Sequence, residues 1–262
     1  MLLLSDFPVI FVHYPTGAGG WFLSSLLHYS FDQTEPFTFD QVGSGHSNRS
    51  IQYINNFYKD FLQTEQGKNI IYETNYDIFS KEARIKYIRE SLLIAPNANK
   101  TIPQVISIHC QNINLFLEAL PHAKCVQIII SDKDLLKCTF NYLFKILAIT
   151  PINFETFCAE RGIINDQFKI AKEKIKNLNA ENLKWFEWAI PFIKDTAKSI
   201  ENNNKFKDRI LEISYEKYMN HDHDLVLEEI IEFVNPDCSL ELFQHLSAYM
   251  LSYRLTQPRF PL

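Results

Sequence analysis

Short apolar runs alternate with longer helical patterns along this chain. The clearest runs cover residues 8–14, 105–109, 124–130 and 209–214, and a weaker one covers 69–73. Val and Ile dominate the clearest runs, and near-continuous apolar segments of this length are typical of strands buried on both faces. The pattern therefore predicts a parallel sheet with helices on both of its faces.

Helical patterns fill the intervals between these runs. We expect helices near 21–27, 50–64, 79–93, 115–120 and 133–147, a helical stretch over 151–206, and a last helix from Leu225 to Val234. Repeats, low-complexity segments and an interdomain linker are absent from the sequence. The alternation of strands and helices predicts an α/β fold, a single domain over residues 1–262 arranged as a three-layer sandwich around a central parallel sheet.

Composition and charge exclude several classes of protein. Hydrophobic residues make up 46% of the chain and charged residues 22%, which is ordinary for a globular protein and excludes a disordered chain, a collagen and a coiled coil. The net charge of −5 provides no overall positive field that would attract nucleic acid or an anionic membrane. An anionic ligand must therefore be held by a local site.

The cysteines and the N-terminus bear on the compartment. The five cysteines are widely spaced and include no C-x-x-C pair, a pattern that favours a reducing compartment over a disulfide framework or a zinc site. The apolar segment at the N-terminus is too short for a signal peptide, because an acidic residue, Asp6, already follows Met1-Leu2-Leu3-Leu4-Ser5. No apolar run approaches the roughly 18 residues of a membrane span. We expect a soluble, cytoplasmic protein with no bound metal, nucleic acid or membrane, in an oligomeric state that the sequence leaves open.

Glycine marks the first candidate site. The chain has only seven glycines, and Gly17, Gly19 and Gly20 lie within four positions, directly after the first predicted strand. Concentrated glycine indicates unusual backbone angles or close backbone approach. A strand, a glycine-rich loop and a helix in this order can bind phosphate through backbone N–H groups and the helix dipole. The alternative is a tight turn that needs glycine only for packing, and the loop has neither the Walker A nor the G-x-G-x-x-G spacing.

Polar side chains also follow later strands. Ligands of open α/β sheets lie at the carboxyl ends of the strands, where His109, Ser131 and Tyr215 are expected. A histidine at that edge is either a general base or a hydrogen-bonded strand-end side chain. Lys133 and Lys137 could add positive charge there, or lie on a solvated helix face.

Two further segments contain histidine. The loop from Gly43 to Asn48 either binds an acceptor or is an ordinary surface loop. We interpret His221-Asp222-His223 as the start of a helix, with Asp222 or Asp224 capping the first-turn amides, and not as a metal site.

The segment Tyr14-Pro15-Thr16-Gly17-Ala18-Gly19-Gly20-Trp21 resembles the Tyr-Pro-Lys-Ser-Gly-Thr-Thr-Trp loop of sulfotransferases. Val105–His109, then Leu120-Pro121 and the run 124–130, are similar to the family's Thr-His strand end, its Leu-Pro and its next strand. Residues 210–218 and the helix that follows resemble the family's strand, its Tyr-Glu-Asp-Leu and its closing helix. The matches extend from about residue 8 to 235 and imply a P-loop NTPase-like sulfotransferase fold.

The resemblance implies a donor nucleotide, PAPS (3′-phosphoadenosine 5′-phosphosulfate), and no metal. Its 5′-phosphosulfate would be held by the loop residues Pro15, Thr16, Gly17, Ala18, Gly19, Gly20 and Trp21. Thr16 stands where the family has the lysine that binds the bridging and sulfuryl oxygens, so a cation is missing where the leaving phosphate gains charge. His109 matches the family's general base.

The same resemblance implies contacts to the rest of the nucleotide. The family's arginine on the 3′-phosphate falls at Ser131 or Ile130, depending on the register, and the serine that joins it falls at Thr139 or Cys138. The aromatic positions against adenine are those of Trp21 and Tyr215, for which plain core packing is the alternative.

Three functions remain open on this basis. The first is a PAPS-dependent sulfotransferase that modifies a hydroxyl or amine of a carbohydrate or small molecule, with 151–206 as the lid over the acceptor. The second is a nucleotide- or anion-binding protein on the same fold that has lost the chemistry, which the absent lysine and arginine favour. The third is a divergent phosphoryl-transfer enzyme, for which Asp132 or Asp134 would have to hold Mg²⁺.

Overall fold

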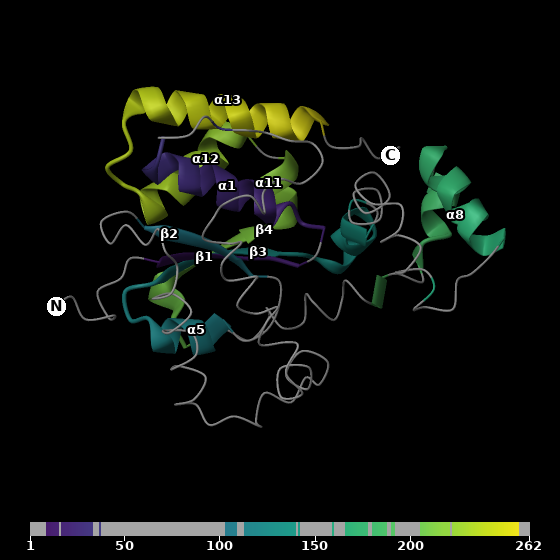
Figure 1. The fold of residues 1–262 in the computed structure, drawn as a ribbon, viewed down its shortest axis with the longest axis horizontal. Coiled ribbons are helices and arrows are strands. Elements are labelled where there is room, and N and C mark those ends of the chain that lie inside the picture. Colours follow the sequence, from purple (N-terminus) through teal and green to yellow (C-terminus); the bar gives the residue numbers. More distant parts are fainter. Residues whose placement is uncertain are drawn as a thin grey trace.

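A four-stranded parallel sheet lies at the centre of the described structure (Figure 1). The computed structural model describes residues 9–15, 17–33, 37, 103–108, 113–139, 141, 159, 166–177, 180–187, 190–191, 205–220 and 222–256. The strands are β1 (Val9–His13), β2 (Gln104–Ile108), β3 (Lys124–Ile129) and β4 (Ile210–Ser214), in the spatial order β2-β1-β3-β4. The four clearest apolar runs are thereby confirmed as strands to within about one residue, whereas the run 69–73 lies outside the described residues.

Helices flank both faces of this sheet. They are α1 (Gly20–Phe31), α5 (Ile113–Ala119), α8 (Asp166–Lys176), α9 (Ala180–Lys184), α11 (Tyr215–Asn220), α12 (His223–Val234) and α13 (Leu240–Thr256), with short 3₁₀ turns η4 (Asp132–Asp134) and η6 (Lys207–Arg209). In Figure 1, α1, α11, α12 and α13 lie above the sheet and α5 lies below it. The expected helices at 50–64 and 79–93 and the loop 43–48 lie outside the described residues, as does much of 133–147 and 151–206.

Alternation along β1 divides the core into two parts. Ile10 and Val12 pack on the side of α1, whereas Val9 and Phe11 pack on the side of α5 with Ile113. Successive strand residues point to opposite faces, so an unbroken apolar run fills both. The fold class expected from the sequence, an α/β protein with an all-parallel sheet flanked by helices, is therefore confirmed.

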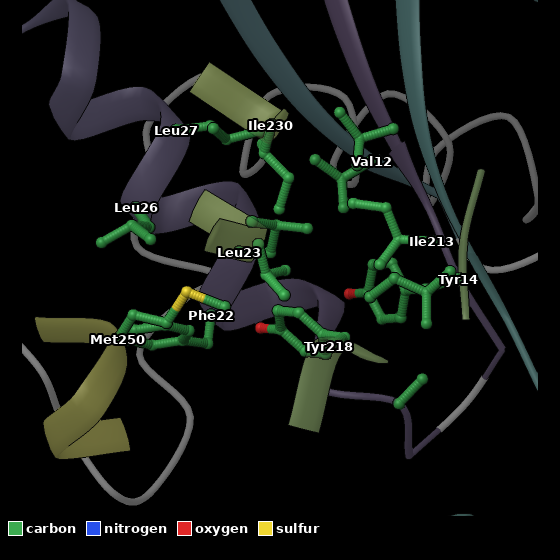
Figure 2. Close-up of a cluster of buried hydrophobic side chains, with 14 of the residues drawn as sticks. Val12, Tyr14, Phe22, Leu23, Leu26, Leu27, Ile213, Tyr218, Ile230 and Met250 are labelled. Carbon is green, nitrogen blue, oxygen red and sulfur yellow. The ribbon is translucent and has the colours of Figure 1, made fainter. Parts of the chain in front are cut away.

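The larger core lies between the sheet and the helices α1, α11, α12 and α13 (Figure 2). Helix α1 contributes its apolar side chains to this core, and α13 packs against both α1 and α12. The buried residues that Figure 2 labels are Val12, Tyr14, Phe22, Leu23, Leu26, Leu27, Ile213, Tyr218, Ile230 and Met250.

Arg209, just before β4, is hydrogen-bonded to the end of α5. Its guanidinium donates to the carbonyl oxygens of Leu117 at 3.0 Å, Leu120 at 3.0 Å and Pro121 at 2.6 Å. The last carbonyls of a helix have no partner within the helix and carry a partial negative charge, which a cation satisfies. This side chain therefore couples the start of β4 to the segment that leads into β3.

Helix α13 corrects the expectation that the last helix ends at Val234. Its 17 residues include buried Leu246, Met250 and Tyr253 on one side and exposed Leu240 and Leu255 on another. Because apolar residues lie on two faces of the helix, the single stripe that identifies an amphipathic helix is missing. The start of α12, in contrast, follows the prediction, since Asp222 accepts a hydrogen bond from the Asp224 amide at 2.9 Å.

Candidate functional site: the glycine loop at the ends of β1 and β3

The candidate site lies where the order of the described strands reverses. The chain passes from β1 to β2 on one side of it, then returns to β3 on the other side and continues to β4. Ligands of open α/β sheets bind at such a switch point, outside the carboxyl ends of the strands. The glycine loop follows β1 and the segment Ser131–Asp134 follows β3, so both lie at this point.

The glycine loop has an unusual backbone. Gly17 has a φ of 88°, and Gly19, the N-cap of α1, has a φ of 78° and a ψ of 13°, both in the left-handed region. Gly20 directly continues into the right-handed helix. A left-handed residue followed by a right-handed one turns successive N–H groups toward the same side, which makes a concavity suited to an anion. The prediction of unusual backbone angles at this loop is confirmed.

The first turn of α1 has no side-chain cap. Gly19 offers no side chain, although its carbonyl oxygen accepts from the amides of Phe22 at 3.1 Å and Leu23 at 3.4 Å. The turn before the helix is closed by the Ala18 amide, which donates to the Pro15 carbonyl at 3.1 Å. Helix dipole and loop amides therefore combine at the switch point.

Packing also requires glycine at two of the three positions. A Cβ atom on Gly20 would lie 2.0 Å from Cδ1 of Tyr14, and one on Gly19 would lie 2.3 Å from the hydroxyl oxygen of Tyr253. Distances this short would displace buried rings, since Tyr14 and Tyr253 are each 1% exposed. Tight packing, the alternative considered for this loop, is thus one reason for its glycines, and the positive φ at Gly17 and Gly19 is another.

Tyrosine side chains form the support beneath the loop. Tyr218 donates weakly from its hydroxyl to the Gly19 carbonyl at 3.4 Å, and the Tyr253 ring stacks on Phe22 with centroids 4.0 Å apart and an angle of 4° between the planes. Burial raises the pKa of both hydroxyls, most strongly for Tyr253. These hydroxyls are therefore neutral at ordinary pH and place no negative charge beside the loop.

Tyr215 and Trp21, the predicted adenine contacts, both pack within the protein. Tyr215 is buried, and its hydroxyl accepts from the Asn141 side-chain amide at 2.9 Å. Burial raises the pKa of Tyr215, and Cys138 raises it further. Trp21 is half-buried and meets the ring of Tyr253 edge-on, with centroids 6.1 Å apart. Contact of either residue with adenine stays a prediction.

The segment after β3 forms hydrogen bonds and an ion pair within the protein. Ser131 donates from its hydroxyl to the carboxylate of Asp134 at 2.5 Å, and Lys137 lies 4.0 Å from the same carboxylate. Asp134 is buried, whereas Asp132 is exposed. Lys133 is exposed and pairs with Glu216 at 2.7 Å, a hydrogen bond that raises the pKa of the lysine.

Three other predicted site residues have different outcomes. Thr139 is buried, and its hydroxyl donates to the Leu135 carbonyl one turn earlier at 2.7 Å. Thr16 and His109 lie outside the described residues, so their predicted contacts with the leaving phosphate and the acceptor stay predictions.

Sequence reasoning missed a polar row on the opposite face of the sheet. His13 and Gln127 are both 0% exposed, and they occupy neighbouring register positions on β1 and β3. Glu212, which is exposed, occupies the next position on β4. His13 follows Val9 and Phe11 on the side of α5, because strand residues two apart share a face. The signal was available as a polar residue interrupting each of two apolar runs.

Metal clusters and membrane-spanning helices are absent from the described part of the chain. Within the described part of the chain, no three His, Cys, Asp or Glu side chains are grouped closely enough to hold a metal ion, and no helix is long and apolar enough to cross a membrane. No family model, curated protein or solved structure matches this chain. The likeness to sulfotransferases therefore depends on the sequence motifs alone.

Proposed function

We propose that the protein binds the phosphorylated end of a nucleotide at the glycine loop. The observation that carries the proposal is the left-handed Gly19 followed by helical Gly20, at the uncapped N-terminus of α1 and beside the end of β3. Loop amides turned to one side and the helix dipole would act on an anion together, and no carboxylate comes from the loop itself to oppose them. A local site of this kind suits a chain whose net charge of −5 attracts no anion at long range.

The nucleotide that we propose is PAPS, and the reaction is sulfuryl transfer on a P-loop NTPase-like sulfotransferase fold. The acceptor oxygen or nitrogen would form a bond to sulfur as the bond from sulfur to the bridging phosphate oxygen breaks. His109 would take the acceptor's proton, and adenosine 3′,5′-bisphosphate would leave with its charge held by the loop amides. The order of β1, loop and α1, together with the His109 strand end and Tyr215, supports this assignment through the resemblance.

A second candidate is a binding protein on the same fold that performs no transfer. The observation that favours it is that Ser131 and Thr139, the residues proposed for the 3′-phosphate, donate their hydroxyls within the protein. The nearby Lys133 is likewise paired with Glu216. Such a protein would bind a nucleotide or another anion weakly, or act through protein contacts, without turning over PAPS.

The first experiment is calorimetric titration with adenosine 3′,5′-bisphosphate in the absence of metal, with ATP plus Mg²⁺ titrated in parallel. Micromolar binding of the bisphosphate supports the site. No binding of the bisphosphate contradicts the PAPS assignment, and tight Mg²⁺-dependent ATP binding would move the assignment to phosphoryl transfer. Sulfuryl transfer by wild type but not by His109→Ala would separate the enzyme from the binding protein, because a positioned base contributes about 10²–10⁴ in rate.

A gain-of-function variant tests the position of the phosphosulfate. Thr16→Lys adds the cation that the family has at this place, and we expect roughly tenfold tighter binding of the bisphosphate. Gln33→Lys is the matched control, because the exposed Gln33 side chain lies just beyond the other end of α1 and the change in net charge is the same. If the two lysine substitutions raise the affinity for the bisphosphate equally, the gain comes from the added net charge alone, and the proposal that the anion binds at the loop is contradicted.

A further inference from the structure

Three side-chain donors of the segment that follows β3 are already used within the protein. The Ser131 hydroxyl donates to the Asp134 carboxylate, and the Thr139 hydroxyl donates to a backbone carbonyl one turn earlier. The Lys133 ammonium is paired with Glu216. A phosphate group needs donors or cations around its oxygens. A phosphate placed at this segment would therefore have to displace one of these contacts.

Acceptor atoms, in contrast, are available at this segment. Oδ1 of Asp134 lies 4.0 Å from the Lys137 ammonium, beyond hydrogen-bond distance, and the residue is 3% exposed. Asn141 is buried to the same extent, and its Nδ2 donates to the Tyr215 hydroxyl. No described residue donates to Oδ1 of Asn141. A buried acceptor without a donor is costly, so this oxygen suits a hydroxyl of a ligand, reached directly or through one water.

These acceptors lie near the glycine loop. The Tyr253 hydroxyl occupies the place that a side chain on Gly19 would take. Burial raises the pKa of Tyr253, and nearby hydroxyls, Tyr215 among them, raise it further. Burial also raises the pKa of Tyr215, and Cys138 and Asp134 add to that effect. Because such electrostatic effects weaken with distance, Gly19 and Asp134 belong to one region at the carboxyl ends of β1 and β3.

We propose that the site prefers a nucleotide with free ribose hydroxyls to one with a 3′-phosphate. This inference rests on the proposed function, since it takes the 5′-phosphate or 5′-phosphosulfate to be at the glycine loop. The sugar then lies at the end of β3, because the end of β2 is the side proposed for His109 and the acceptor. A carboxylate beside a ribose accepts from a free hydroxyl, whereas an arginine there accommodates a phosphate. The 5′-phosphosulfate remains the donor group, and the 3′-phosphate of PAPS adds no affinity.

The charges at the end of β3 support this preference. Three described carboxylates and two described ammonium groups lie there, those of Asp132, Asp134, Glu216, Lys133 and Lys137. Of the two arginines that the structure describes, Arg209 donates to carbonyls at the end of α5 and Arg254 donates to the Tyr218 carbonyl. The described groups therefore offer a phosphate no surplus of positive charge. A carboxylate largely withdrawn from water, such as that of Asp134, repels an anion over several Å without touching it.

Calorimetric titration with adenosine 5′-monophosphate and adenosine 3′,5′-bisphosphate, both without metal, tests the preference. We expect the monophosphate to bind about threefold to tenfold more tightly. Equal or tighter binding of the bisphosphate would overturn the inference and leave the proposed anion site intact. Adenosine without phosphate should bind more weakly than the monophosphate. Binding of neither nucleotide, or adenosine as tight as the monophosphate, would overturn the proposed function and this inference with it.

The variant Asp134→Asn tests which residue sets the preference. It removes the charge and keeps an oxygen that accepts from the Ser131 hydroxyl. The affinity for the bisphosphate relative to the monophosphate should rise about fivefold, whereas a merely structural role would weaken both nucleotides alike. Asp237→Asn is the matched control with the same change of charge. Asp237 is exposed and follows α12, whose Phe233 carbonyl accepts from Lys124 at the opposite end of β3. An unchanged ratio in Asp134→Asn, or an equal rise in the control, would overturn the role of Asp134.

A deoxynucleotide tests the hydroxyl in the wild-type protein, independently of how any variant folds. Loss of one hydrogen bond to a buried acceptor should make 3′-deoxyadenosine 5′-monophosphate bind roughly tenfold more weakly than adenosine 5′-monophosphate. Equal binding of the two would show that the 3′-hydroxyl meets no acceptor, and the inference would be wrong.

Discussion

Substitution of Gly20 by alanine gives the sharpest test of how the glycine loop is held. The new Cβ atom would lie 2.0, 2.1 and 2.5 Å from three atoms of the Tyr14 ring. The ring cannot move aside cheaply, because Tyr14 is 1% exposed and belongs to the larger core. The intrinsic helix propensity of alanine exceeds that of glycine by about 1 kcal/mol. A loss of stability in Gly20→Ala would therefore come from the steric clash with Tyr14 and not from backbone conformational preference.

The expected net loss for Gly20→Ala is about 3 kcal/mol, the upper part of the range for overpacking a rigid core. For a chain of this size, that corresponds to a fall in Tm of roughly 6–12 °C. Urea unfolding should show a lower midpoint with an unchanged slope. Ser25→Ala is the control on the same helix, since it loses only the hydroxyl bonded to the Trp21 carbonyl at 3.1 Å and should cost less than about 1 kcal/mol.

A double-mutant cycle with Tyr14→Leu isolates the contact. In the Tyr14→Leu background the ring is absent, so Gly20→Ala should be neutral or slightly stabilising, and the coupling free energy should exceed about 1 kcal/mol. A single Gly20→Ala variant as stable as wild type, or equal effects in both backgrounds, would refute the explanation that Tyr14 excludes a side chain at position 20.

Arg209, Asp222 and the two buried tyrosines Tyr218 and Tyr253 each make a contact whose loss can be measured. Arg209→Met should lower the free energy of unfolding by about 1–3 kcal/mol in urea denaturation, because the carbonyl oxygens of Leu117 and Pro121 each lose a donor and that of Leu120 keeps only the Ala123 amide; a change under 0.5 kcal/mol would contradict this role. Asp222→Ala should cost about 1 kcal/mol through loss of the α12 cap, while Asp222→Asn should retain most of it, as urea midpoints would show. Burial raises the pKa of Tyr218 and Tyr253 above the usual 10, so above pH 10 the unfolded chain binds fewer protons than the folded one and stability falls. Tyrosinate absorbance at 295 nm should then rise together with unfolding, and full ionisation of every tyrosine in a folded protein would contradict the burial.

Local sequence signals predicted the sheet well because each strand carries its own evidence. The sequences of β1 and β3 are rich in Val and Ile. Such a composition is enough to predict a strand that is buried on both faces of a sheet. The glycine loop was equally visible, because seven glycines in the whole chain make three in four positions stand out. Strands and the glycine loop could therefore be predicted because each is encoded within one short segment of the sequence.

The parts that sequence reasoning missed depend on distant segments. Tyr253, whose hydroxyl leaves no room for a side chain at position 19, and Tyr218, which donates to the Gly19 carbonyl, are far along the chain and resemble ordinary core residues. The polar row of His13 and Gln127 becomes a feature only once the strand register places the two side by side. Helix α13 was missed for a different reason, since its apolar residues face both the core and the exterior.

The support beneath the glycine loop has a consequence for the order of folding. The hydrogen bond from Tyr218 to Gly19 joins residues 199 positions apart, and Tyr253 contributes from still further along the chain. Contacts of such separation form slowly, and synthesis on the ribosome delivers the N-terminal segment first. The loop therefore leaves the ribosome early, yet it acquires its packed geometry only after α13 has been made. A nascent chain arrested before residue 253 should carry β1 and α1 without a formed anion site, so ligand binding would require synthesis to have passed Tyr253.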